Sequence, residues 1–290
     1  MRLLIGLLVF LLAGDLARGQ NWSIWSMKLD GTDLQKHVAD PDLSFGSVKV
    51  SPDGKQLAFD SWPAAGFSQA AQRIHICDLD GTNMRSLGLG AMPDWSSSGK
   101  LLTYHEYLKL KGSLIVGDDG KGLEVAAEKM GSPTWFPNGR VLAFLDWGRK
   151  NIQIQNVVTG KRRPLRDYLI GDINHGFSIA PDGKAICYAQ GRFEFCKMSV
   201  MAVDEDTPAR VIHRGPIVGG FSFHPDGKRV VFAEGKGNSG EPGNSPARLF
   251  IVNVEDSEVT EIPGAKAGEY YVNPTFSPDG ERVFFSSTLK

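Results

Sequence analysis

A short motif recurs six times along this chain at nearly constant spacing, and no other feature of the sequence restricts the fold as strongly. Four copies contain Pro-Asp-Gly, one contains Pro-Asn-Gly, and one keeps only the glycine. The motif glycines are Gly54, Gly99, Gly139, Gly183, Gly227 and Gly280. They lie 45, 40, 44, 44 and 53 residues apart. A period of about 45 residues is typical of four-stranded propeller blades.

Each motif is followed by an apolar pattern of period two. Pro fixes φ, Asp or Asn bonds to nearby backbone and Gly accepts the left-handed conformation, so the motif predicts a tight hairpin turn. An aliphatic residue stands three positions after each glycine, and an aromatic residue stands five positions after it. The pairs are Leu57 and Phe59, Leu102 and Tyr104, Leu142 and Phe144, Ile186 and Tyr188, Val230 and Phe232, and Val283 and Phe285. The residues between them are mostly apolar too, so we expect a strand covered on both faces by neighbouring blades.

The two ends of the chain complement each other. Counted from Gly280 through the C-terminus and on from Gln20, the next motif glycine is again 45 residues away. Segment 22–34 resembles segment 74–84 and supplies the two strands that the last repeat lacks. We therefore predict an all-β fold, a six-bladed β-propeller with four-stranded antiparallel blades, whose ring is closed by N-terminal strands that complete the last blade.

The first nineteen residues predict a secretory signal peptide. Arg2 precedes an apolar run, 3–13, that is shorter than the roughly 20 residues a helix needs to span a bilayer. Small residues in segment 17–19 suit a cleavage site. An uncleaved anchor or a buried strand is the alternative. We expect removal of 1–19, and a single exported domain, 20–290, that is periplasmic or secreted and has no membrane span.

The repeats resemble the WD40-like repeats of the TolB family. The resemblance rests on segments 51–55, 57–59 and 78–82 and on their copies over residues 20–290. It implies a TolB-like propeller in the envelope of a bacterium. Full-length TolB carries an α/β domain before its propeller, for which this sequence leaves no room, so the Tol–Pal role does not transfer directly. The same repeat occurs in peptidases and polysaccharide lyases, and the fold alone therefore does not fix the function.

Composition and missing motifs favour a binding module over an enzyme. The formal net charge is −1, so we expect no nucleic-acid partner. The sequence has no Gly-x-Ser-x-Gly turn, no His-Glu-x-x-His zinc motif and no Walker loop. We expect a monomer that binds another envelope protein or a peptide and needs no cofactor, with a divalent cation in the channel left open. The alternatives are a propeller lyase or hydrolase and a carbohydrate- or ion-binding propeller.

Polar residues occupy one repeated position of the first strand of each blade. They stand five residues before the motif glycine, on the face expected to line the central channel. These residues are Lys49, Asp94, Thr134, Ser178, Ser222 and Thr275. Lys49 and Asp94 are the charged members and come from adjacent blades. They predict either a neutralising ion pair or a ligand site in the channel.

Two connections between the second and third strands are long, 60–73 and 234–248. Long loops on a rigid scaffold are where binding residues concentrate. We expect the binding site on this face, at the mouth of the channel. Besides Lys49 and Asp94, its candidate residues are Trp62, Phe67, His105, Trp147 and His175.

The three cysteines are compatible with export. A two-residue turn at Gly191-Arg192 would place Cys187 opposite Cys196 at a non-hydrogen-bonded position. This register predicts a cross-strand disulfide in an oxidising compartment, although a shift of the turn by one residue would break the pairing. Cys77 is then left as a buried thiol.

Overall fold

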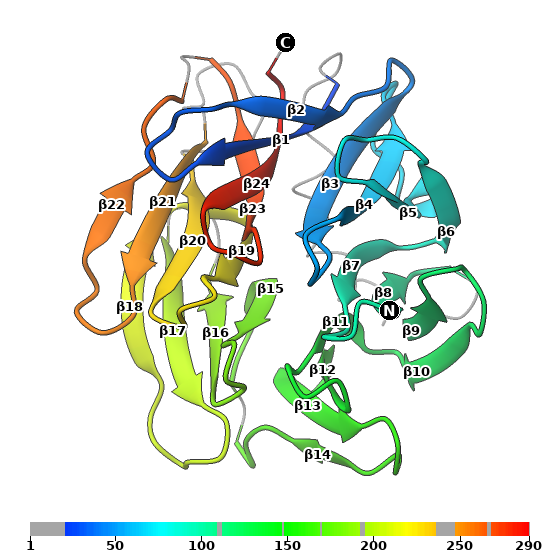
Figure 1. Cartoon of the computed structure of the whole chain (residues 1–290). Helices are drawn as coiled ribbons and strands as arrows, with labels where there is room; N and C mark the ends of the chain where they lie inside the picture. Colours follow the sequence, from blue (N-terminus) through cyan, green and yellow to red (C-terminus); the bar gives the residue numbers. More distant parts are fainter. Residues whose placement is uncertain are drawn as a thin grey trace, which may run out of the picture.

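Six four-stranded antiparallel sheets surround a common centre in the computed structural model (Figure 1). The structure describes residues 21–108, 112–146, 148–168, 170–191, 195–235, 247–265 and 268–289, without the side chains of Asn174 and His175. The fold is the six-bladed propeller that the sequence predicts. We number the blades from the first complete one.

The strands of each blade follow in sequence from the centre outwards. Blade 1 contains β3 (Leu43–Val50), β4 (Gln56–Pro63), β5 (Arg73–Asp78) and β6 (Arg85–Leu89), with a short 3₁₀ helix, η1 (Gln69–Ala71), between β4 and β5. Blade 2 contains β7 (Ala91–Trp95), β8 (Leu101–Glu106), β9 (Gly112–Gly117) and β10 (Glu124–Glu128). Blade 3 contains β11 (Gly131–Trp135), β12 (Val141–Asp146), β13 (Asn151–Asn156) and β14 (Arg162–Pro164). Blade 4 contains β15 (Ile173–Ile179), β16 (Ala185–Gln190), β17 (Cys196–Ala202) and β18 (Arg210–Gly215). Blade 5 contains β19 (Ile217–Phe223), β20 (Arg229–Glu234), β21 (Arg248–Asn253) and β22 (Val259–Glu261).

Blade 6 is built from both ends of the chain, and this confirms the predicted ring closure. It contains β23 (Tyr271–Phe276), β24 (Arg282–Ser287), β1 (Ser23–Lys28) and β2 (Gln35–Val38). The strand order is β2-β1-β24-β23, with Trp25 opposite Phe285. In Figure 1 the blue β1 lies directly beside the red β24. Closure through a shared blade removes the open edges that a terminal blade would expose.

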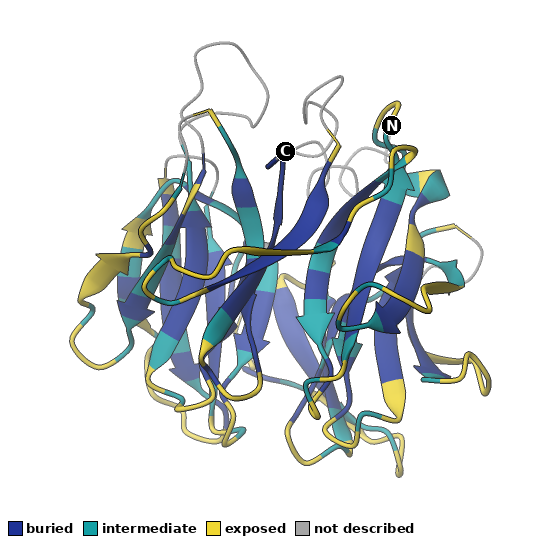
Figure 2. Ribbon diagram, turned by 45° about the horizontal axis from the view of Figure 1, so that its top comes forward, coloured by how far each residue is buried: buried dark blue, intermediate teal, exposed yellow. Residues whose placement is uncertain are grey.

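The motif turns lie at one end of the propeller, which we call the turn face. In the first motif, the Asp53 carboxylate accepts hydrogen bonds from Ser51 Oγ (2.7 Å) and Lys55 N (3.1 Å), and Gly54 has a φ of 74°. The motif aspartates therefore shape turns rather than a metal site. We call the opposite end, where β4 connects to β5, the loop face. Figure 2 shows that the strands are buried along most of their length and that the exposed residues gather in the turns.

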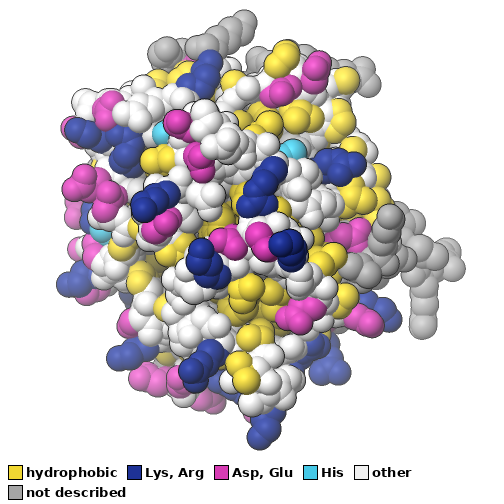
Figure 3. Space-filling model, turned by 45° about the vertical axis from the view of Figure 1, so that its right-hand side comes forward, with side chains coloured by type: hydrophobic (Ala, Val, Ile, Leu, Met, Phe, Trp, Pro, Cys, Tyr) yellow, Lys and Arg dark blue, Asp and Glu magenta, His cyan; other side chains and the backbone are white. Residues whose placement is uncertain are grey.

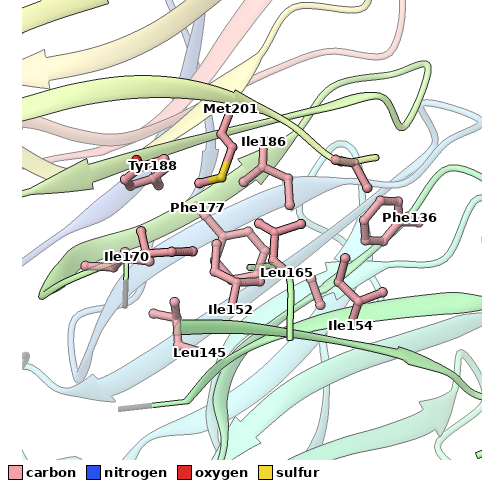
Figure 4. Packing of buried hydrophobic residues seen from close by; sticks show 13 residues of the cluster. Phe136, Leu145, Ile152, Ile154, Leu165, Ile170, Phe177, Ile186, Tyr188 and Met201 are labelled. Carbon is pink, nitrogen blue, oxygen red and sulfur yellow. The ribbon is translucent and has the colours of Figure 1, made fainter. Parts of the chain in front are cut away.

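Buried hydrophobic clusters lie between neighbouring blades, one cluster for each of the six interfaces in the described residues. Alternate residues of one strand point into different clusters: Leu57 and Phe59 pack against blade 6, whereas Ala58 packs against blade 2. Figure 4 shows the cluster between blades 3 and 4, where Ile152 and Phe177 meet from opposite blades. The prediction of strands covered on both faces is confirmed.

The innermost strand of every blade contains a bulge that the sequence did not predict. At each bulge the pairing with the second strand shifts, and a residue adopts a positive φ. These residues are Ser47, Met92, Ser132, Gly176, Gly219 and Asn273. A bulge leaves a residue unpaired in the ladder and turns its backbone groups away from the sheet. Here the bulges lie between the loop face and the channel-lining positions.

The predicted disulfide is wrong. β16 and β17 pair with Cys187 opposite Val200 and Gln190 opposite Lys197, so the two strands are not joined through the predicted two-residue turn. Cys196 therefore lies four residues, or about 13 Å, along the strand from the partner of Cys187. That separation is about twice the reach of a disulfide. All three cysteines are buried free thiols, and burial raises the pKa of Cys77 to about 12 and of Cys196 to about 11.

The outer surface carries charges of both signs. Figure 3 shows Lys and Arg side chains intermixed with Asp and Glu over one side of the molecule. This distribution fits the net charge of −1. Across the described ranges, no helix has the length and apolar character needed to cross a membrane.

Candidate functional site

The predicted channel residues join neighbouring blades. Three of them accept a hydrogen bond from the backbone N–H of the aromatic residue that stands four positions before the motif glycine of the next blade. The bonds run from Trp135 N to Asp94 Oδ2 (2.8 Å), from Phe223 N to Ser178 Oγ (3.1 Å) and from Phe276 N to Ser222 Oγ (3.3 Å). Ser178, Ser222 and Thr275 are buried, whereas Lys49, Asp94 and Thr134 are partly exposed. The repeated polar position therefore serves inter-blade bonding as well as the channel.

Lys49 and Asp94 form the predicted ion pair. Lys49 Nζ lies 3.9 Å from Asp94 Oδ1, and the two side chains are 32% and 18% exposed. Lys49 has no acceptor atom, so it cannot bind the N–H of Trp95 as the serines of other blades bind the equivalent N–H groups. Instead, the Asp94 carboxylate accepts the N–H of Trp95 as well as the N–H of Trp135. Burial raises the pKa of Asp94, while Lys49 and the two N–H groups oppose this shift. Blades 1 and 2 are thus joined by a charged pair that water or a ligand can reach from the channel.

Trp62 and Phe67 come together at the loop face. Trp62 ends β4 and Phe67 follows in the connection to β5, and their rings meet edge to face with centroids 5.8 Å apart. Both side chains are partly exposed. Trp62 lies against the backbone of β3, because a Cβ atom on Gly46 would come within 2.9 Å of Trp62 Cζ3. The two candidate residues therefore lie together at the loop face, and their role in binding stays a prediction.

Asp60, which sequence reasoning missed, lies beneath this aromatic pair. It is 2% exposed, and its Oδ2 accepts the N–H of the bulged residue Met92 at 2.9 Å. The Ser47 hydroxyl donates to the same carboxyl group. Burial raises the pKa of Asp60 to about 6, and these two hydrogen bonds oppose the shift.

A sequence signal for Asp60 did exist. It stands six residues after a motif glycine, where the other blades carry His105, Leu145, Ala189, Ala233 and Ser286. Asp60 is the acidic member of an otherwise neutral or imidazole-bearing set. This repeat position is buried in every blade, and a carboxylate there is unfavourable unless nearby groups hydrogen-bond to it.

His105 and Tyr107 continue the cluster from blade 2. His105 is 3% exposed, and its Nδ1 lies 3.2 Å from the Met130 carbonyl oxygen. Burial lowers the pKa of His105 to about 4, so its ring is neutral at physiological pH. Its ring packs edge to face on Tyr107, with centroids 4.2 Å apart. The structure therefore places His105 below the surface, where it supports Tyr107.

Tyr107 links the two blades at the mouth. Its pKa is raised well above the usual value by burial and by the negative charge of Asp60, and a hydrogen bond to Gln69 of η1 opposes the shift. We call Asp60, Trp62, Phe67, Gln69 and Tyr107 the mouth cluster. It brings together an aromatic pair, a buried carboxyl group and the loop 64–72.

Two predicted site residues cannot be compared with this geometry. Trp147 lies outside the described residues, and the side chain of His175 does too. The backbone of His175 belongs to β15, within the bulge between Asn174 and Phe177. Among the side chains that are described, no three His, Cys, Asp or Glu residues gather as metal ligands would.

The mouth cluster is better suited to binding than to chemistry. A pKa near 6 is within the range useful for acid–base catalysis. However, Asp60 is buried, bonded to Met92 N and Ser47, and adjacent to the packed Trp62. A general acid or base must reach the proton that it transfers. The partly exposed aromatic pair, in contrast, offers flat apolar surface at the loop face, and such surface is common in protein and ligand sites.

Comparisons with known proteins agree with the fold. The model of the TolB beta propeller domain family matches residues 117–290. A putative TolB from Agrobacterium tumefaciens is similar with a TM-score of 0.69 and 18% identity, over 92% of this chain and 98% of that one. TolB from Acinetobacter baumannii is similar with a TM-score of 0.57 and 14% identity, over 84% and 63% of the two chains.

An enzyme shares the architecture as well. An oligogalacturonate lyase in complex with manganese is similar with a TM-score of 0.56 and 13% identity, over 95% of this chain and 99% of that one. No curated protein matches the sequence. Identities this low show a common fold and carry no activity across. The match to the family model spans more than half of the sequence, and on that ground this chain belongs to the TolB β-propeller domain family.

Proposed function

We propose that this protein is an exported binding module that holds an envelope protein or peptide at the loop face, over the mouth cluster of blade 1. The observation that carries the proposal is the convergence of Trp62 and Phe67, both partly exposed, at the loop face. The Lys49–Asp94 pair lies deeper, since Lys49 pairs with Ala58, four residues before Trp62 in β4. Aromatic side chains seated next to polar groups dominate the binding energy of protein interfaces. Loops on a rigid propeller can hold such an anchor in place without further folding cost.

The test is capture from an envelope extract with tagged protein spanning 20–290. We expect the native protein to retain a partner and the Trp62→Ala/Phe67→Ala variant to lose it. A matched control is Leu34→Ala/Met84→Ala, which removes two side chains, 37% and 40% exposed, from turns at the other end of the blades. The control must bind as the native protein does. Equal capture by all three proteins contradicts the proposal.

The lyase or ligand-binding alternative predicts a different result. In that case Mn²⁺, Ca²⁺ or an oligogalacturonate raises the melting temperature of the purified protein, and the two aromatic substitutions do not abolish capture. The similarity to the manganese-bound lyase makes these the informative ligands to try. A rise in melting temperature without partner capture would replace the binding-module proposal.

Export is part of the same proposal and has its own test. Fractionation of cells that express the full chain should place the protein in the periplasm or medium, with an N-terminus at Gln20. Light scattering of that material should give the mass of a monomer. Retention of residues 1–19 in a membrane fraction would show an anchor instead.

A further inference from the structure

The ring is closed by a set of polar contacts as well as by strand pairing. Arg282, in β24, donates from Nε and Nη2 to Ser26 Oγ of β1, at 3.1 and 3.0 Å. It also pairs through Nη1 with the carboxylate of Asp33, in the turn between β1 and β2. These residues are 249 to 256 positions apart in the sequence. One guanidinium therefore holds the N-terminal strands to the C-terminal strand.

His37, in β2, extends this set of contacts to blade 1. Its Nε2 lies 2.8 Å from Ser26 Oγ, and its Nδ1 lies 2.7 Å from the Leu79 carbonyl oxygen. Leu79 belongs to the turn between β5 and β6. The closure latch, as we call it, thus consists of Ser26, Asp33, His37 and Arg282, and it connects three segments that meet only in the folded ring.

The donors and acceptors of the latch fix the protonation state of His37. Ser26 Oγ accepts from Arg282, so its single hydroxyl proton is available for His37 Nε2. Nε2 must then be the unprotonated nitrogen, and Nδ1 carries the proton that is donated to Leu79 O. Every group of the latch is satisfied with a neutral imidazole. The latch therefore requires the neutral form of His37.

A second proton on His37 would oppose this arrangement. It would sit on Nε2 and face the Ser26 hydroxyl proton, and it would add a positive charge close to the Arg282 guanidinium. Burial and Arg282 both lower the pKa of His37, and the bond to Leu79 O opposes them. The Phe284 ring, with its centroid 5.0 Å from that of His37, offers no acceptor for the extra proton.

The other charged groups around His37 do not neutralise the added charge. They are Asp33 and Lys28 of blade 6, Lys36 of the same strand, and Asp78 and Asp80 of the blade 1 turn. Asp33 is engaged by Arg282 and has Lys28 nearby. Lys36 points to the face of Trp25, 4.6 Å from the ring centroid. The Asp78 and Asp80 carboxylates bond to Asn83 and Thr82 and keep their charge, but the charged group that shifts the pKa of His37 is Arg282 and not a carboxylate.

We propose that the closure latch is a proton-sensitive switch: protonation of His37 releases β1 and β2 from β24 and from blade 1 while the other blades stay folded. Release would expose the unpaired edge of β24 together with Ile24, Val38 and Phe284 of the interface between blades 6 and 1. This inference does not depend on the proposed binding function. It concerns how acid changes the ring itself.

The test is amide hydrogen exchange of the whole chain at pH values from 7.5 to 4.5, with rates corrected for the intrinsic effect of pH. Protection of residues 23–38 is compared with that of residues 141–156 in blade 3. Linkage to one proton predicts that the ratio falls by up to about tenfold per pH unit below pH 6.5. In His37→Gln, which keeps a polar side chain that does not titrate, the ratio should change less than twofold over the whole range.

His75→Gln is the matched control, because His75 is also buried but lies outside the latch. It should keep the native pH dependence of the ratio. Parallel loss of protection in both segments at every pH, or an unchanged pH dependence in His37→Gln, would overturn the proposal. Should His37→Gln loosen the latch at all pH values, NMR titration of the native His37 ring decides: a pKa at or above 6.5 would overturn the switch.

Discussion

At the scale of single residues, the buried environment of Asp60 opposes the charge of its carboxyl group. Its pKa, about 6, exceeds the ordinary value of 3.8, so folding favours the protonated form. The protonated form contributes stability below pH 3.8, and this contribution is lost as pH rises through 6. The difference corresponds to about 3 kcal/mol of unfolding free energy.

We therefore expect Asp60→Asn to be more stable than the native protein above pH 6, by up to about 3 kcal/mol, with the difference vanishing near pH 4. The amide oxygen can still accept the N–H of Met92. Urea unfolding at pH 4, 5, 6 and 7.5 measures the effect. Asp53→Asn is the control of opposite sign, because hydrogen bonds from Ser51 and Lys55 lower the pKa of Asp53. A destabilised Asp60→Asn at pH 7.5 would show that the charge is needed.

His75 acts in the opposite direction over the same pH range. Burial, with a smaller contribution from Arg73, lowers its pKa from 6.5 to about 4. Its neutral ring bonds to Ser61 Oγ at 2.9 Å and stacks on Phe59. The stability that it contributes is present above pH 6.5 and is lost as pH falls towards 4.

We expect His75→Gln to flatten the acid side of the stability profile. Between pH 7 and pH 4 the native protein should lose up to about 3 kcal/mol more than the variant. Because Asp60 gains stability over the same interval, the comparison is sharpest in an Asp60→Asn background, measured by urea unfolding at each pH. Equal losses in the two proteins would show that His75 is protonated as easily in the folded state as in the unfolded state.

At the scale of elements, the Asp-Gly-Thr turn connects blades as well as strands. Gly81, between β5 and β6, has a φ of 84°, and a Cβ there would lie 2.1 Å from the carbonyl oxygen of His37 in blade 6. Gly54, in a motif turn, has a φ of 74° with open space around it. The two glycines thus share a conformation and differ in their surroundings.

Gly54→Ala should cost about 1–2 kcal/mol of unfolding free energy, because it carries only the strain of the left-handed conformation. Gly81→Ala should cost more, since the added methyl group also has to displace blade 6 from blade 1. Urea unfolding of the two variants at pH 7.5 measures both. Equal costs would mean that the close approach to His37 contributes nothing to the packing of the blades.

The elements that follow a regular apolar alternation were predicted from the sequence. The elements in which an extra residue interrupts that alternation were missed. The alternation around Leu57 and Phe59 located the second strand of each blade, because both of its faces are covered. The bulges at Ser47 and Met92 add a residue that no period of two can show. The register of the hairpin was wrong for the same reason: β16 ends at Gln190 and β17 begins at Cys196, which does not fit a two-residue turn.

The candidate site was predictable only in part, for related reasons. Trp62 and Phe67 were found because a long insertion on a repeat scaffold indicates a loop. Lys49 and Asp94 were found by comparison of equivalent repeat positions. Asp60 was missed because its significance lies in a contact with the bulge at Met92, across a blade interface, and the sequence does not indicate where that bulge falls.

At the scale of the whole molecule, each hydrophobic cluster contains residues of two neighbouring blades, so no single blade has a complete hydrophobic core. Phe232, for example, is fully buried in β20 and packs in the cluster between blades 4 and 5. Loss of one blade would therefore expose the apolar faces of both neighbours. A closed ring adds a further constraint, because the first and last strands are paired in one sheet. Folding should accordingly be cooperative around the ring at neutral pH.

The six tryptophans make this cooperativity measurable. Four of them fall in the sequence of blades 1 to 3, whereas Phe232 lies in blade 5. Trp25, in blade 6, packs in the cluster between blades 5 and 6, so the comparison is made in a Trp25→Phe background. We expect Phe232→Ala to cost about 3–5 kcal/mol and to shift the urea transition seen by tryptophan fluorescence as far as the one seen by far-UV circular dichroism. Val158→Ala, at a side chain 74% exposed, should leave both transitions in place. If circular dichroism reports an earlier transition than fluorescence in Phe232→Ala, blades 4 and 5 unfold separately and the ring is not one cooperative unit.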